Sequence, residues 1–209
     1  MSKRPELAAK VAQCISQWSE VEIHLGAFLG LLLHANQKAA VAMYAGLENR
    51  SAQIRLITLA AEASLPLEHF DVISALIQKV IRPAMRERDR LAHWTWGYSQ
   101  DVPDALLISE PARTLMSLMR ALKEQPGIDY AAVPSAFDQI FVIRESDLDG
   151  ILKRSTEAKY YVRLAMATVW EANRQQERDL HLRELSNVPR IREGLDRLAR
   201  DRQKTQASL

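Results

Sequence analysis

Apolar residues recur at helical spacing over a long stretch at the start of the chain. Between residues 5 and 34 they return every three or four positions, which is the period of one face of an α-helix. Pro5 suits the first turn of such a helix, where a backbone N–H has no intrahelical partner. Gly26 and Gly30 lower helix propensity but would let another helix approach closely. The stripe consists of Leu7, Val11, Cys14, Trp18, Leu25, Leu29 and Leu32. The pattern predicts one long helix that buries a continuous face in a helical bundle.

The next two segments are also expected to be helical. Residues 38–63 form one predicted helical segment, and Pro66 marks the break after it. A third helix is expected over residues 67–93. Pro83 lies inside this third helix and should kink or restart it, because proline lacks the N–H that an internal helical position needs.

The pattern changes between residues 97 and 145, which hold four of the eight prolines. Two β-like runs, 105–109 and 139–144, are expected to pair as a small hairpin or edge sheet. A short helix over residues 112–124 would lie between them. This region is therefore predicted to be a small insertion in an otherwise helical chain.

The last third returns to helical spacing. A long helix is expected from Ser146 to about residue 185, opened by a capping-box-like pair of Ser146 and Asp149. After Pro189 the apolar spacing predicts a short amphipathic helix whose other face is rich in arginine. The expected fold class is mainly all-α: an up-and-down bundle over 1–185, followed by a basic amphipathic helix or tail over 186–209.

Composition and missing motifs exclude several classes of function. The net charge of +2 is small, so any nucleic acid would have to bind a local basic patch. The single cysteine, Cys14, cannot form a disulfide framework or a cysteine zinc site and is expected to be a core residue. The five histidines lack metal-ligand spacing, and no phosphate loop, dinucleotide motif or nucleophile elbow is present. We therefore expect no metal and no cofactor.

Targeting signals are missing from the sequence as well. The first ten residues have no apolar signal region. The longest apolar run, 25–33, has nine residues, whereas a membrane helix needs about 20. The sequence therefore predicts a soluble, cytoplasmic protein with no membrane association.

Two charged residues interrupt the apolar stripes of their helices. Glu22 lies four residues after Trp18 in the first helix, and Arg88 lies three residues before Leu91 in the third. A buried charge without a partner is costly, so each residue needs a counter-charge or a wet cleft. The simplest interpretation is that the two faces meet and that Glu22 helps to hold Arg88. A purely structural ion pair between the helices is the alternative.

The segment around Arg88 reads RERDRLAHW over residues 86–94. Arg88, Asp89 and His93 match a motif of an arginine, a polar residue and a histidine four to six residues after the arginine. In this motif the chain resembles the HEPN family over roughly residues 5–97, and the late helix from Ser146 would complete an HEPN-like bundle.

The resemblance implies a function. HEPN proteins with an intact motif cut RNA without a metal, in toxin–antitoxin or phage-defence systems, so an antitoxin or defence partner protein is also implied. Arg88 and His93 would be catalytic: histidine side chains exchange protons near neutral pH, and arginine donates to phosphate oxygens. Asp89 and Glu22 would orient them.

The spacing of the motif bears on assembly. Five residues at about 100° each place Arg88 and His93 roughly 140° apart on a regular helix. They would not converge on one atom unless the helix ends before His93 or two copies of the motif face each other. The resemblance implies the second arrangement, a homodimer with a composite cleft.

Basic and aromatic residues near the motif are candidate RNA contacts. The basic ones could guide a phosphate backbone, and the aromatic ones could stack on unpaired bases or simply pack the bundle or the dimer interface. These candidates are Lys79, Arg82, Arg86, Arg90, Trp94 and Trp96.

Two other functions remain open from the sequence. One is a non-catalytic HEPN-like dimer that binds RNA or a partner protein and uses Arg88 structurally. The other is a helical scaffold with no role in nucleic acid binding.

Overall fold

The computed structural model describes residues 4–34, 36–124, 140–170 and 174–207. The fold is mainly α-helical with one small antiparallel sheet, which confirms the expected fold class. The chain divides into two compact units. The smaller unit comprises Met1–Ser16 and Arg86–Lys153, and the larger comprises Gln17–Met85 and Arg154–Leu209.

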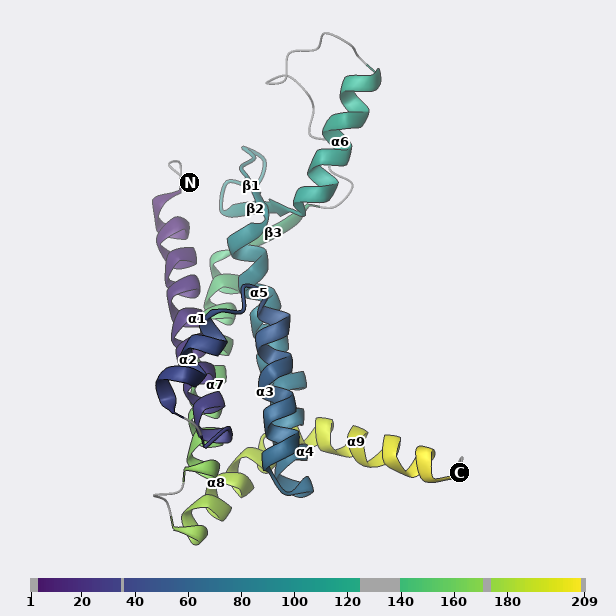
Figure 1. The fold of residues 1–209 in the computed structure, drawn as a ribbon. Coiled ribbons are helices and arrows are strands. Elements are labelled where there is room, and N and C mark those ends of the chain that lie inside the picture. The colour runs from purple at the N-terminus through teal and green to yellow at the C-terminus, as the bar shows by residue number, and fades with distance from the viewer. Residues whose placement is uncertain (1–3, 35, 125–139, 171–173, 208–209) are drawn as a thin grey trace. The chain divides into compact units, whose positions relative to one another are not determined.

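The first helix is α1 (Pro5–Leu32; Figure 1), and every residue of its predicted apolar stripe is buried. Its two glycines lie against α2 (Gln37–Ala45), as the close approach of another helix predicted. A Cβ on Gly26 would stand 3.2 Å from Cδ1 of Tyr44, and one on Gly30 would stand 3.6 Å from Cβ of Ala40.

The prediction of one helical segment over 38–63 is wrong in one respect. The structure has two helices there, α2 (Gln37–Ala45) and α3 (Arg50–Ser64). The side-chain oxygen of Asn49 accepts hydrogen bonds from the backbone N–H groups of Ser51 and Ala52 at 2.8 and 3.4 Å. This N-cap satisfies the first turn of α3 and ends the preceding segment.

The predicted third helix runs without a break but changes its geometry before Pro83. It consists of α4 (Leu67–Leu76), a π-helical turn η1 (Ile77–Ile81) and α5 (Arg82–His93). The N–H of Arg82 donates to the carbonyl of Ile77, five residues earlier. The expected irregularity at Pro83 is therefore a π-turn just before it, a wide turn of the kind often found at functional sites.

The predicted long helix over 146–185 is two helices. They are α7 (Glu145–Val169) and α8 (Gln175–Asn187). The expected capping box of Ser146 and Asp149 is also wrong: Asp147 accepts from the N–H of Arg144 at 2.8 Å, two residues earlier in register. Asp149 instead pairs with Lys10 at 2.7 Å.

The last helix is longer than expected. It is α9 (Pro189–Ala207), and Ile191 near its start is fully buried in the core of the larger unit. At Gly194 the helix lies so close to α4 that a Cβ would be 2.9 Å from Cβ of Ala75. The first half of α9 is therefore a packed part of the larger unit.

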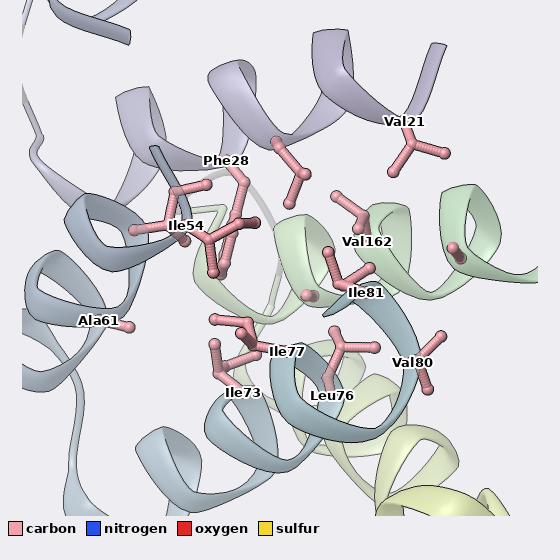
Figure 2. Close-up of a cluster of buried hydrophobic side chains, with 14 of the residues drawn as sticks. Val21, Phe28, Ile54, Ala61, Ile73, Leu76, Ile77, Val80, Ile81 and Val162 are labelled. Carbon is pink, nitrogen blue, oxygen red and sulfur yellow. The ribbon is translucent and has the colours of Figure 1, made fainter. Parts of the chain in front are cut away.

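The larger unit has one hydrophobic core, and α1, α3, α4, η1 and α7 contribute the side chains labelled in Figure 2. Phe28, Ile54, Ile77 and Val162 are among its labelled side chains, and all of them are nearly inaccessible to solvent. These side chains come from segments far apart in the sequence, so the core ties the bundle together.

The smaller unit contains the sheet. Its strands are β1 (Thr95–Gly97), β2 (Ala105–Ser109) and β3 (Phe141–Arg144), in the order β1-β2-β3, and α6 (Pro111–Glu124) lies between the last two in sequence. The predicted antiparallel pairing of the two runs is confirmed, with Leu106 opposite Ile143. Gln139 lies outside the described residues. Strand β1 was not predicted.

A second hydrophobic cluster holds the smaller unit together. Cys14 is completely buried in it, as the apolar stripe predicted, and its thiol donates to the carbonyl of Leu148 at 3.5 Å. The cluster consists of Leu7, Val11, Cys14, Leu91, Leu106, Leu148 and Ile151.

None of the described helices combines the length and the apolarity that crossing a membrane requires.

Candidate active site around Arg88 and His93

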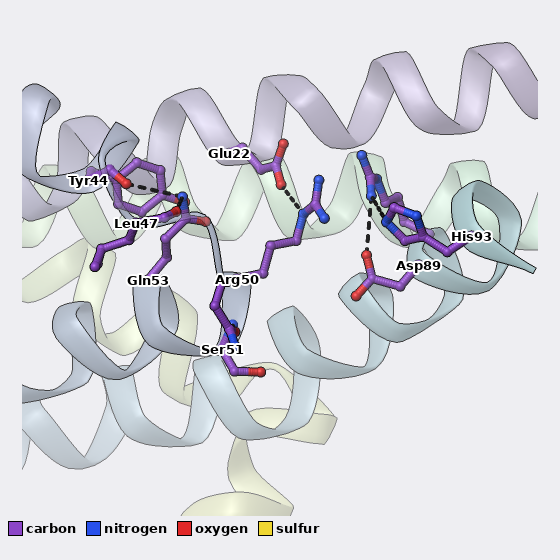
Figure 3. Close-up of polar contacts among 10 residues, drawn as sticks. Glu22, Tyr44, Leu47, Arg50, Ser51, Gln53, Asp89 and His93 are labelled. Carbon is purple, nitrogen blue, oxygen red and sulfur yellow. Dashed lines mark hydrogen bonds and ion pairs between the residues drawn. The ribbon is translucent and has the colours of Figure 1, made fainter. Parts of the chain in front are cut away.

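Arg88 and His93 lie one and a half turns apart at the end of α5, in the smaller unit. The Nη1 atom of Arg88 is 3.4 Å from Nε2 of His93 and donates to Oδ1 of Asp89 at 3.2 Å (Figure 3). The helix ends at His93, where the N–H of Trp94 still donates to the carbonyl of Arg90. The structure therefore brings together all three residues of the motif.

This contact corrects the geometric argument about assembly. Neither a helix end before His93 nor a second copy is needed for the two side chains to meet, because His93 is the last residue of the helix and the long arginine side chain spans the remaining angle. A dimer is not needed to bring Arg88 and His93 together, so the expectation of a homodimer rests on the resemblance alone.

The hydrogen bond from Arg88 determines which tautomer of the His93 imidazole it can contact. A guanidinium can only donate hydrogen bonds, so Nε2 of His93 must be the acceptor, with the proton on Nδ1. In this arrangement the lone pair of Nε2 accepts from Arg88, and Nε2 can act as a base once a substrate group replaces that hydrogen bond. At 3.4 Å the hydrogen bond is long, so a substrate group could replace it at little cost.

The two side chains differ in exposure. Arg88 is 8% exposed, whereas His93 is exposed to solvent. Within the described part of the chain, Nε of Arg88 is buried and has no hydrogen-bond partner. A buried donor without an acceptor is costly, and one explanation is an acceptor supplied by a ligand.

A cluster of a cation and two aromatic rings lies beside the motif. The guanidinium of Arg90 is 5.2 Å from the ring centre of Trp94 and 5.5 Å from that of Phe141, and the two ring centres are 5.3 Å apart. Arg90 thus covers part of Trp94 and joins the end of α5 to β3. Sequence reasoning missed Phe141, because it lies in a strand 47 residues further along the chain.

The other candidate RNA contacts are distributed over both units. Arg86 is exposed in the smaller unit, and Trp96 packs against the hydrophobic cluster there, which favours the packing role over base stacking. In the larger unit, Lys79 forms an ion pair with Glu193 at 2.5 Å. Arg82 is half-buried, and its Nε has no partner in the described structure.

Glu22 has a different partner from the one predicted. Its carboxylate accepts from Nε of Arg50 at 2.6 Å, and both side chains are half-buried (Figure 3). Arg88 is engaged by Asp89 and His93, so each of the two charged residues has a partner in its own unit that the sequence did not predict. Arg50 was overlooked because it begins a separate helix, which sequence reasoning had merged with the preceding one.

Histidine and acidic residues do not gather into a metal centre anywhere in the described ranges. Comparison of the chain with family models, curated proteins and solved structures finds no match in any of the three.

Proposed function

We propose that the protein is a metal-independent endoribonuclease in which His93 moves a proton and Arg88 stabilises charge on the phosphate. The observation that carries the proposal is the contact of Arg88 with Nε2 of His93 at the end of α5. It places the basic nitrogen of an imidazole beside a fixed cation, which is what cleavage of an RNA phosphodiester requires.

The reaction would use the ribose 2′-hydroxyl as the nucleophile. Nε2 of His93 takes its proton while the 2′-oxygen bonds to the adjacent phosphorus, and the bond from phosphorus to the 5′-oxygen breaks. The 5′-oxygen leaves with a proton from water or from His93 of a second copy. The products are a 2′,3′-cyclic phosphate and a 5′-hydroxyl, and no atom changes its oxidation state.

The resemblance to HEPN proteins supports the biological context of the proposal. A toxin-like or phage-defence nuclease would be held inactive by an antitoxin or a defence partner, and would act as a homodimer in the cytoplasm. The candidate RNA contacts that lie nearest to the motif in the sequence of the smaller unit are Arg86, Arg90 and Trp94.

The burial of Arg88 favours a second candidate function. A guanidinium that is 8% exposed and bonded to Asp89 is also what a structural arginine looks like. In that case the protein would be a non-catalytic dimer that binds RNA or a partner protein.

Cleavage of single-stranded RNA by the purified protein tests the proposal. We expect His93→Ala and Arg88→Ala each to lower the cleavage rate by roughly 100-fold or more, which is the usual contribution of a general acid or base. His24→Ala and Arg183→Ala are the matched controls, since neither belongs to the site, and should keep the wild-type rate. Cleavage should survive EDTA and leave a 2′,3′-cyclic phosphate.

The two candidate functions give different results in this assay. A wild-type protein that binds RNA without cutting it would support the non-catalytic function. Full activity in folded Arg88→Ala and His93→Ala variants would refute the proposed site.

A further inference from the structure

One cavity of the larger unit has a basic lining. Its volume is about 310 Å³, at the lower end of small-molecule sites, which span about 300 to 1,000 Å³. Among the described residues, an arginine and two histidines line it and no carboxylate does. The described lining residues are Leu32, His34, Ser64, Leu65, Pro66, His69, Thr168, Val169, Gln175 and Arg178. A lining with three basic side chains suits an anion.

Arg178 lacks an acceptor in this cavity. Its Nε is buried and makes no hydrogen bond, and its guanidinium forms no ion pair with any described residue. Arg178 as a whole is half-buried, and arginine stays charged in proteins. Its buried Nε is therefore a charge-assisted donor for which the described part of the protein supplies no acceptor.

The N-terminus of α4 adds further donors at the same cavity. Pro66 is the N-cap, and no side chain caps the helix. The backbone N–H groups of Leu67, Glu68 and His69 have no acceptor in the described structure, and Pro66 and His69 both line the cavity. Helix N-termini carry partial positive charge and bind phosphate through such N–H groups. Glu68 is exposed and does not line the cavity.

His34 reaches the cavity in a backbone conformation that favours glycine. Its φ of 46° lies in the left-handed region, at the end of α1. A glycine would adopt this conformation with less strain than a histidine. The histidine at this position adds a third basic side chain to the lining.

We propose that this cavity binds the phosphate group of a small molecule. The guanidinium of Arg178 and the free N–H groups of α4 would donate to the phosphate oxygens, and His34 and His69 would line the remaining sides. The volume admits inorganic phosphate or a compact phosphomonoester. The inference concerns the larger unit and does not depend on the proposed nuclease activity.

Isothermal titration of the full chain with inorganic phosphate and with ribose 5-phosphate tests the proposal. Chloride at equal ionic strength serves as the baseline. Arg178→Gln removes the charge but keeps a hydrogen-bonding side chain. Arg183→Gln makes the same change at an exposed position of α8 and is the matched control. We expect Arg178→Gln to weaken phosphate binding at least tenfold and Arg183→Gln to leave it unchanged.

Thermal melts without phosphate separate a binding role from a structural one. Because Arg178 has no partner in the described structure, Arg178→Gln should melt no lower than wild type in chloride and should lose only the rise in Tm that phosphate gives. Tighter binding of ribose 5-phosphate supports a phosphomonoester ligand, and equal or weaker binding supports free phosphate. The proposal is overturned if wild type binds neither compound, or if both variants weaken binding equally.

Discussion

At the scale of single residues, the role of a charged side chain depends on the residue with which it pairs. Glu22 and Arg88 interrupt apolar stripes in the same way. In the structure, Glu22 forms an ion pair with Arg50, whereas Arg88 contacts Asp89 and His93. Helical spacing identified which residues are unusual. It could not identify their partners, because a partner is fixed by how helices pack and not by the spacing within one helix.

Burial makes a testable prediction for the only cysteine. Desolvation, with a smaller effect of the negative charge of Asp149, raises the pKa of the Cys14 thiol from 9.0 to about 11. The folded state therefore favours the protonated thiol, and the stability that this provides is lost as pH rises from 9 towards 11. We expect the stability difference between wild type and Cys14→Ala to shrink over this range, measured by urea unfolding. Native protein at pH 7.5 should react with a thiol reagent only on unfolding.

At the scale of elements, helical spacing predicted where the chain is helical better than where its helices end. The stripe of α1 and the pairing of β2 with β3 followed from spacing alone. The end of α2 was missed, although Asn49 is a strong N-cap residue, because apolar spacing continues on both sides of it. Strand β1 has three residues and exists through its pairing with β2, so no local pattern could have predicted it.

The packing of α9 on α4 depends on a glycine. A Cβ on Gly194 would lie 2.9 Å from Cβ and 3.3 Å from Cα of Ala75, so the helices would have to move apart. Gly194→Ala should therefore lower the Tm, although alanine normally stabilises a helix by roughly 1 kcal/mol over glycine. Gly30→Ala is the control, because its Cβ would meet Ala40 at an ordinary 3.6 Å and should not lower the Tm. Equal effects of the two changes in thermal melts would show that α9 does not pack tightly at this point.

At the scale of the whole molecule, the resemblance to HEPN proteins implies an assembly that the chain does not need for its motif to form. Arg88 and His93 meet within one chain, so each copy of a dimer would carry its own pair. A composite cleft would add the pair of the second copy, as two-fold symmetry presents the same surface twice.

We expect the protein to be a homodimer at micromolar concentration, with a mass by light scattering of twice the 23.7 kDa of the chain. If the cleft is composite, a mixture of Arg88→Ala and His93→Ala proteins should cleave RNA faster than either variant alone, because mixed dimers keep one arginine and one histidine. A monomer with full activity, or a mixture with no gain, would contradict the composite cleft.

The π-helical turn of η1 also affects where the chain can tolerate a one-residue deletion. A π-turn holds one residue more than an α-helical turn, so it behaves like a single-residue insertion within a helix. Deleting the exposed Gln78 would restore ordinary helical geometry and leave every later residue of this helix close to its present position around the axis. Among natural variants of this chain, one-residue deletions should therefore be tolerated far more often in η1 than in the regular turns of α4 and α5, where a deletion would rotate the later residues by about 100° and misalign the motif.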